Sequence, residues 1–143
     1  MDAFCSCIRL TSVVIPGSVT SIASSAFSGC SSLAEIKVSE NNQNFKDIDG
    51  NLYSKDGKTL VQYACGKRDT SFTIPNSVET ISRYALMGCN SLTEIVIPTS
   101  VTSIDEYVFA GCTGLTIYCE ATSKPQGWDK NWANGNCNII WGA

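Results

Sequence analysis

One stretch of the chain, residues 92–114, reads LTEIVIPTSVTSIDEYVFAGCTG. Residues 10–32 (LTSVVIPGSVTSIASSAFSGCSS) and residues 69–91 (DTSFTIPNSVETISRYALMGCNS) repeat its length and place one proline, one glycine and one cysteine at the same positions. A unit of this size cannot bury its own apolar side chains, whereas stacked copies bury them against one another. The three copies therefore predict a solenoid.

Each unit is expected to begin with a β-strand. Its first residues alternate apolar and variable side chains, as in Leu92-x-x-Ile95-x-Ile97, which is the period of a half-buried strand. Pro98 then removes a backbone donor and ends the strand. The rest of the unit should return through a second extended segment and a helical or 3₁₀ turn, which carries one large apolar residue in each copy: Phe27, Leu86 and Phe109. The expected fold is a solenoid of right-handed stacked coils, mostly β and irregular, with a parallel β-sheet on one face.

The units arrange the whole chain, 1–143, as a single solenoid domain. Its first residues match the end of a unit, so they are interpreted as a partial repeat. From residue 115 onward the pattern stops, and a solenoid must hide the apolar side chains of its last coil. The predicted parts are the partial repeat 1–9, the coils 10–32, 33–68, 69–91 and 92–114, and a C-terminal cap, 115–143.

The coil 33–68 has 36 residues where the other coils have 23. Its extra residues include Asp49-Gly50, a dipeptide typical of β-hairpin turns, followed by two short apolar stretches. We expect residues 40–68 to form an island in which residues 50–63 make a β-hairpin that stands out from the solenoid. Phe45, Leu52, Leu60 and Tyr63 should anchor this hairpin.

Composition narrows the classes of function. Histidine is absent, which removes the usual general base near neutral pH and the commonest metal ligand, so neither an enzyme nor a cofactor is expected. The ten Lys and Arg residues are scattered and the net charge is −3, which does not suit a nucleic-acid partner. No apolar run approaches the roughly 20 residues of a membrane span. The first residues do not resemble a signal peptide, so an export signal is expected on a longer parent chain.

The units resemble the BspA-like leucine-rich repeats of bacterial surface proteins. Their pattern is roughly L-x-x-I-x-I-P-x-x-V-x-x-I-x-x-x-A-F-x-x-C, and residues 10–30 fit it with one exchange, at Val13. The departures are Asp69 for Leu, Leu86 for Phe, Ser39 for Pro and Ala64-Cys65 where Pro is frequent. The resemblance implies display on the cell surface, or secretion, and attachment to host or neighbouring-cell proteins. It implies no catalysis and supplies no binding residues by position.

Four of the eight cysteines share one position of the repeat and are expected to stack in a column: Cys7, Cys30, Cys89 and Cys112. Free cysteine behaves as a small buried apolar residue, and this is the favoured interpretation. A disulfide between stacked neighbours is sterically conceivable but should strain the coils. A metal site at Cys5-x-Cys7 lacks the usual ligand spacing. In the cap, Cys119 and Cys137 lie on two strand-like segments, and the sequence leaves open a disulfide between them.

Two further groups of residues are candidate sites. Trp128, Trp132 and Trp141 suit the capping of the last coil better than a sugar or peptide platform, and the first two are spaced for one face of a short helix. The outward strand positions form two columns, a surface that solenoids use for partners. The columns are Ser12, Glu35, Ser71 and Glu94, and Val14, Lys37, Thr73 and Val96.

Two functions fit this sequence. The first is a surface adhesion or protein-interaction module that binds an extracellular or host protein or glycan, which the repeat and the resemblance favour. The second is a structural spacer that projects another domain of a longer surface protein, which the plain Ser- and Thr-rich faces favour. The identity of a ligand does not follow from the residues.

Overall fold

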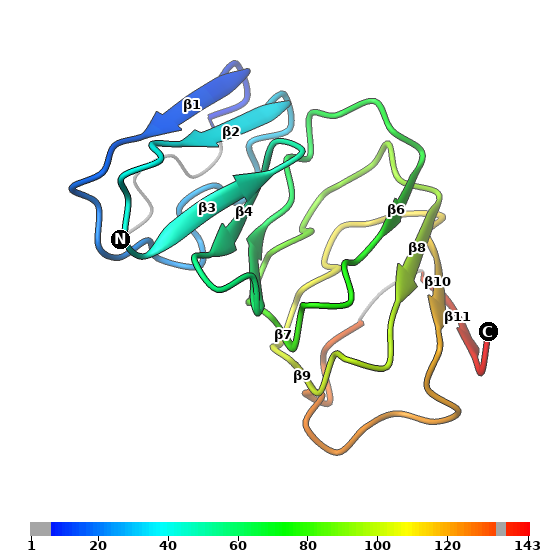
Figure 1. The fold of residues 1–143 in the computed structure, drawn as a ribbon. Coiled ribbons are helices and arrows are strands. Elements are labelled where there is room, and N and C mark those ends of the chain that lie inside the picture. Colours follow the sequence, from blue (N-terminus) through cyan, green and yellow to red (C-terminus); the bar gives the residue numbers. More distant parts are fainter. Residues whose placement is uncertain (1–6, 134–136) are drawn as a thin grey trace.

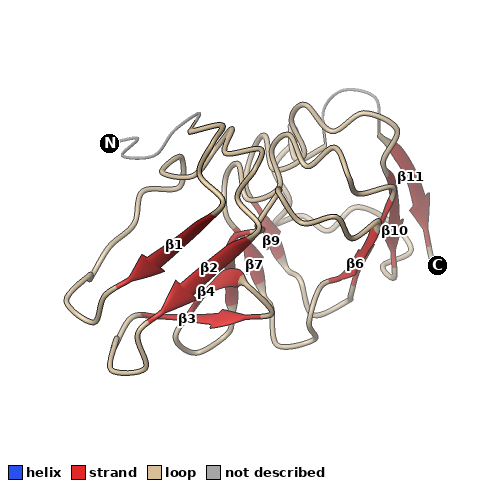
Figure 2. Cartoon of the chain, turned by 90° about the horizontal axis from the view of Figure 1, so that it is seen from above, coloured by secondary structure: helices blue, strands red, loops and turns tan. Residues whose placement is uncertain are grey.

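The computed structural model describes residues 7–133 and 137–143. Its coils follow one another from the N-terminal to the C-terminal end of the molecule (Figures 1 and 2). Within these residues the regular structure is entirely β, and no helix forms. The strands are β1 (Ser12–Ile15), β2 (Glu35–Val38), β3 (Phe45–Ile48), β4 (Asn51–Ser54), β5 (Thr59–Gln62), β6 (Ser71–Thr73), β7 (Thr80–Ile81), β8 (Glu94–Ile97), β9 (Ser103–Ile104), β10 (Thr116–Cys119) and β11 (Asn138–Trp141).

The strands form three sheets. One pairs β1 with β2, the second has the order β11-β10-β8-β6, and the third has the order β3-β4-β5-β7-β9. All pairings between successive coils are parallel, as in β8 with β10, where Ile95 lies opposite Ile117. The predicted solenoid with parallel sheets is confirmed, because each coil contributes the strand that its alternating residues indicate.

The second half of each unit forms separate tight turns, and the expected helical or 3₁₀ turn is wrong. In the coil 69–91, the amides of Ala85, Met87 and Cys89 donate to carbonyl oxygens three residues earlier. The amides between them, Leu86 and Gly88, donate instead to Val108 and Ala110 of the next coil, over 3.1 and 2.8 Å. A helix needs consecutive internal bonds. Here every second amide donates its hydrogen bond to the neighbouring coil instead.

The island differs from the expected hairpin in two ways. It has three strands, because β3 pairs antiparallel with β4 and β4 with β5. Asp49 and Gly50 both have positive φ, 52° and 82°, the conformation of a two-residue hairpin turn. Nor does the island stand out from the solenoid, since β5 pairs in parallel with β7 of the following coil.

Strands β4 and β5 separate two hydrophobic cores. Leu52 and Val61 belong to the smaller core with Phe27, whereas Tyr53 and Leu60 belong to the larger core. All four island side chains are buried. Both faces of this strand pair are therefore covered, one by each part of the solenoid. The extra length of this coil is therefore accommodated between the two cores, while the turn residues Lys55 and Asp56 are exposed.

The C-terminal segment closes the larger core as a further coil. Trp128 forms a parallel bridge with Ile104, and the Asp129 amide donates to the Ile104 carbonyl oxygen over 2.8 Å. Trp128 and Trp132 are buried and meet edge to face, with ring centroids 4.7 Å apart. The expected short helix is wrong, because the Trp132 amide bonds to Asp129 in a single turn. Indole rings thus replace the smaller apolar residues of the regular coils.

Candidate functional site

The two predicted strand columns are not continuous. Ser12 lies opposite Glu35, and Ser71 lies opposite Glu94, but β2 and β6 are not neighbours in any sheet. The same break separates Val14 and Lys37 from Thr73 and Val96. The single face expected across four coils is therefore wrong. Two separate surfaces take its place: a smaller strip on β1 and β2, and a larger strip on β6, β8, β10 and β11.

The island causes this break. The Ile36 amide of β2 donates to the Gly50 carbonyl oxygen over 2.8 Å, so the hairpin turn occupies the edge that β6 would use. Near the end of the same coil, the Gly66 amide donates a hydrogen bond to the Leu33 carbonyl oxygen over 2.7 Å. The extra residues of the island therefore separate β2 from β6 in space as well as in sequence.

The larger strip covers four strands and contains residues that the repeat pattern alone did not identify. The columns continue across β10 and β11, where Thr116 and Asn138 extend the first, and Tyr118 and Ile140 extend the second. Ile140 is 38% exposed, while Val96 and Tyr118 are half-buried. The alternation in residues 116–119 and 138–141 was a usable signal, but these strands lie outside the 23-residue units.

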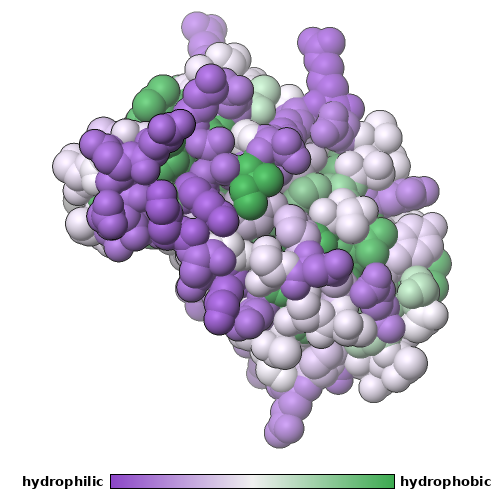
Figure 3. Space-filling model, in the orientation of Figure 1, coloured by the Kyte–Doolittle hydropathy of each residue, from purple (hydrophilic) through white to green (hydrophobic). Residues whose placement is uncertain are grey.

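Polarity differs along the molecule. In the view of Figure 3, hydrophilic residues gather over the β1–β3 end, whereas the β6–β11 end is more neutral and carries separate hydrophobic residues. On the smaller strip Val14 is 67% exposed beside Lys37. The larger strip therefore offers the broader weakly polar surface.

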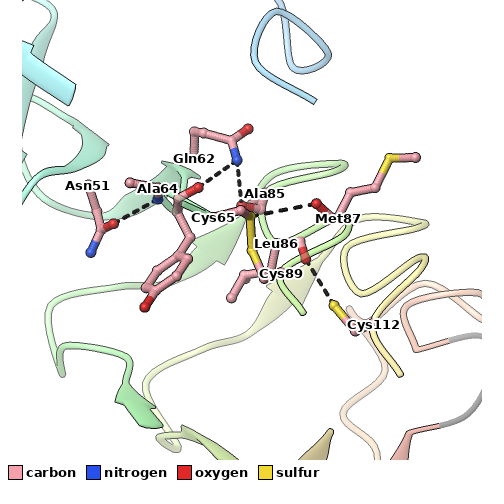
Figure 4. Close-up of a disulfide and its surroundings, with 10 residues drawn as sticks. Asn51, Gln62, Ala64, Cys65, Ala85, Leu86, Met87, Cys89 and Cys112 are labelled. Carbon is pink, nitrogen blue, oxygen red and sulfur yellow. Dashed lines mark hydrogen bonds between the residues drawn. A yellow bond between two sulfur atoms is a disulfide. The ribbon is translucent and has the colours of Figure 1, made fainter. Parts of the chain in front are cut away.

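The cysteine column contains a disulfide that the sequence analysis missed. Cys65 and Cys89 are bonded, with their Cα atoms 4.6 Å apart, so the expectation that Cys89 is a free thiol is wrong (Figure 4). Cys65 lies 24 residues before Cys89, one coil away, although it belongs to the island and not to a regular unit. The bond links the island to the next coil within the larger core.

The remaining members of the column differ in burial. Cys30 is buried, Cys112 is a buried free thiol, and Cys7 is a partly buried free thiol. The Cys112 thiol donates to the Leu86 carbonyl oxygen over 3.0 Å, and burial raises its pKa to about 11. Neutral, hydrogen-bonded thiols of this kind are unreactive at physiological pH. Cys5 lies outside the described residues.

The disulfide that the sequence left open between Cys119 and Cys137 does not form, and both thiols are free. The register explains this result, because Cys119 lies opposite Trp141, four residues beyond Cys137. At about 3.3 Å per strand residue, that offset exceeds the reach of a disulfide. Cys137 instead lies beside Cys112, with its sulfur 3.8 Å from the Cys112 carbonyl oxygen.

The tryptophans do not present an open platform. Trp128 and Trp132 are almost fully buried, and the Trp128 indole N–H donates to the Val101 carbonyl oxygen over 3.1 Å. Trp141 is partly buried and packs against both of the other rings.

Comparison with known proteins shows the family. A model of the BspA-type leucine-rich repeat region matches residues 1–56 and 61–125, in six copies. The chain belongs to the BspA-type leucine-rich repeat family. No curated protein matches the chain.

Solved leucine-rich repeat proteins share the fold of this BspA-type chain. A leucine-rich cell surface protein from Faecalibacterium prausnitzii is 31% identical, with a TM-score of 0.70, over 83% of this chain and 31% of that one. A leucine-rich repeat protein from Eubacterium ventriosum is also 31% identical, with a TM-score of 0.64, over 80% of this chain and 38% of that one. The pneumococcal vaccine antigen PcpA, at 17% identity and a TM-score of 0.63, matches 93% of this chain with 43% of its own length.

The chain thus spans less than half the length of these structures. Across residues 7–133 and 137–143, no three His, Cys, Asp or Glu residues are grouped so as to hold a metal ion. No described helix could cross a membrane.

Proposed function

We propose that this chain is a cell-surface or secreted interaction module that binds a protein of a host or neighbouring cell through the larger strip, β6-β8-β10-β11. The observation that carries the proposal is the outward row Thr73, Val96, Tyr118 and Ile140, in which an aromatic ring stands between two aliphatic side chains on adjacent strands. Apolar and aromatic side chains at the centre of a surface, with polar residues beside them, are typical of protein-binding sites.

The polar neighbours of this row complete the surface. Ser71, Glu94 and Asn138 are exposed, and Thr116 is half-buried, along the adjacent row. Parallel strands are about 4.8 Å apart, so four strands give a width of about 15 Å. This is too narrow for a standard interface of about 800 Å² per partner. The proposal therefore requires contributions from further coils, and the binding of the isolated chain should be weak.

A matched pair of variants tests the proposal. Val14 and Val96 occupy the same repeat position but lie on different strips. We expect Val96→Thr combined with Ile140→Thr to reduce binding to the best ligand of a panel of purified extracellular-matrix proteins and glycans at least about tenfold. Threonine keeps the branched side chain that strands favour. Val14→Thr should leave binding unchanged.

The outcomes separate the candidate functions. Loss of binding in the Val14→Thr variant alone would contradict the choice of strip. A glycan as the best ligand would contradict the choice of a protein partner. If neither this chain nor a longer array that contains it binds any member of the panel, the spacer function is supported instead. The spacer is favoured by the small polar residues Ser12 and Ser71 on the strands.

A further inference from the structure

The first regular coil, residues 10–32, has an open groove at the N-terminal end of the molecule. This N-terminal groove has a volume of about 470 Å³ and is lined by β1 and by the turns that follow it. Val19 and Ile22 belong to its lining and are half-buried. Their counterparts in the last regular coil, Val101 and Ile104, are each only 1% exposed, because coils pack on both sides of them. The groove is therefore the uncovered end of the smaller core.

The backbone beside the groove lacks a partner that the later coils have. At the same repeat position β7 and β9 pair in parallel, and Ile104 of β9 forms a further bridge with Trp128. The equivalent residues of the first coil, Ser21 and Ile22, belong to no strand, and their amides donate no backbone hydrogen bond within the described part of the chain. Unpaired backbone at the edge of a β-structure can pair with another chain.

The coil that lines the groove carries no charge. Residues 10–32 contain no Asp, Glu, Lys or Arg, whereas the two later regular coils contain three charged residues each. Where the last regular coil has Asp105 and Glu106, the first has Ala23 and Ser24. A contact between identical copies about a twofold axis brings residues near the axis close to their own copies, so a charge there would meet the same charge. A charge-free groove therefore suits a second copy of this chain as its partner.

The opposite end of the molecule does not offer a matching surface. Trp128 and Trp132 close the larger core there and are 2% and 4% exposed. A head-to-tail arrangement would place the open groove of one copy against the closed end of the next. Two open grooves meet only when the N-terminal ends of two copies face each other, which gives a closed dimer and not a filament.

We propose that this chain forms a symmetric dimer in which the N-terminal grooves of two copies cover each other. Val19 and Ile22 of each copy are then buried by the partner, as the equivalent side chains are buried by neighbouring coils within one chain. The unpaired backbone at Ser21 and Ile22 becomes available for pairing across the interface.

The dimer does not depend on a ligand of the larger strip, but it bears on how such a ligand would be held. β1 and β11 lie at opposite ends of the molecule (Figure 1). A dimer joined at its N-terminal ends therefore carries one larger strip towards each outer end. Attachment at two points strengthens the weak binding that one narrow strip provides.

The oligomeric state of the chain tests the proposal. Sedimentation equilibrium should give the mass of one chain, 15.4 kDa, at about 1 μM and approach twice that mass near 1 mM, since a small groove supports only a weak interface. Ala23→Asp combined with Ser24→Glu should keep the chain monomeric at both concentrations. These changes copy the last regular coil, so the fold accommodates them, while they place like charges across the twofold axis.

A control variant and a second measurement locate the contact. Thr122→Asp combined with Ser123→Glu adds the same charge at exposed positions of the C-terminal segment and should dimerise as the wild type does. Hydrogen exchange of the amides in residues 17–25 should be slower near 1 mM than near 1 μM in the wild type, with no change in β11. The urea midpoint of Ala23→Asp/Ser24→Glu at about 1 μM should match that of the wild type.

Several results would overturn the proposal. A wild-type chain that stays monomeric near 1 mM has no such dimer. A dimer that Ala23→Asp/Ser24→Glu retains, or one that slows exchange in β11 and not beside the groove, uses another surface. A monomer whose groove is covered by a further coil of a longer array, or by phosphatidylcholine vesicles, has a different occupant. The Val96→Thr/Ile140→Thr variant should dimerise normally, so failure of the larger strip and failure of the dimer can be distinguished.

Discussion

The side-chain amide of Asn42 donates a hydrogen bond to the carbonyl oxygen of Pro16 over 2.9 Å. The same nitrogen donates to Val19 over 3.0 Å, while the side-chain oxygen accepts from the amides of Asn44 and Phe45, both over 2.8 Å. Asn42 has no exposed surface. One side chain therefore satisfies four backbone groups and joins the first regular coil to the start of the island.

Replacing Asn42 by alanine should destabilise the chain strongly. The change leaves buried donors and acceptors without partners, and each such group costs about 1–3 kcal/mol. We expect the free energy of unfolding, measured by urea titration, to fall by at least about 2 kcal/mol. Asn41→Ala is the control, because Asn41 is exposed and its side-chain oxygen accepts a hydrogen bond from the exposed Ser39 hydroxyl. A loss in Asn42→Ala no larger than in Asn41→Ala would contradict the assigned bonds.

The disulfide between Cys65 and Cys89 can be measured by counting thiols. Denatured protein should label at no fewer than two additional cysteines when a reductant is present, and a non-reducing digest should contain the peptide that joins Cys65 to Cys89. The double variant Cys65→Ser/Cys89→Ser should be less stable by about 3 kcal/mol, because the bond restricts the unfolded chain. Equal thiol counts under both conditions would show that the two residues are not bonded.

Stability should fall at alkaline pH. Burial raises the pKa of Cys112 and of Cys119 from 9.0 to about 11, and that of Tyr53 and of Tyr63 from 10.0 to about 12. The unfolded chain loses these protons first, so the stabilisation is complete below pH 9 and declines as pH rises through 11. The urea midpoint should be constant from pH 7 to 8.5 and lower at pH 10.5. Cys112→Ala/Cys119→Ala should reduce this decline; an unchanged decline would exclude the thiols as its cause.

Shortening the turn between β4 and β5 should weaken the fold, although a protruding hairpin would tolerate it. The Lys58 carbonyl oxygen accepts from the amides of Glu79 and Thr80, over 2.7 and 3.0 Å, and that of Gly57 accepts from the Ser77 hydroxyl over 3.1 Å. Replacement of residues 54–58 by Asn-Gly makes the loop three residues shorter and so displaces these backbone acceptors from the next coil, and each bond lost costs about 1 kcal/mol. The exposed Lys55→Ala change should have little effect. Unchanged urea stability of the deletion would show that the turn does not hold the next coil.

The solenoid could be predicted because its cause is periodic. Apolar residues such as Ile95 and Ile97 recur with the spacing of a strand, and both are fully buried. Two buried faces in the island were harder to infer. The adjacent pairs Leu52-Tyr53 and Leu60-Val61 do not alternate, and a short continuous apolar run indicates a strand covered on both sides. We expected that hairpin to stand out from the solenoid.

Other features have no signal in a single repeat. Cys65 pairs with Cys89 because the island returns the chain to the column one residue out of the 23-residue period. The split between Glu35 and Ser71 depends on where the Gly50 carbonyl oxygen lies, which is a property of the packed island. The left-handed backbone conformation at Tyr84 could not be predicted from the sequence, because such conformations are expected at glycine and asparagine. Contacts between units decide all three.

The Cys65–Cys89 bond also limits how far the molecule can lengthen under tension. If the chain is pulled by its two ends, force passes through the disulfide and bypasses the backbone between the two cysteines, which are 24 residues apart. At about 3.4 Å per extended residue, roughly 80 Å of length is withheld until the bond is reduced. The coils on either side, including the smaller core around Phe27, carry the load and unravel first. A thiol reagent would thus act as a release for a tether that mechanical force alone cannot fully extend.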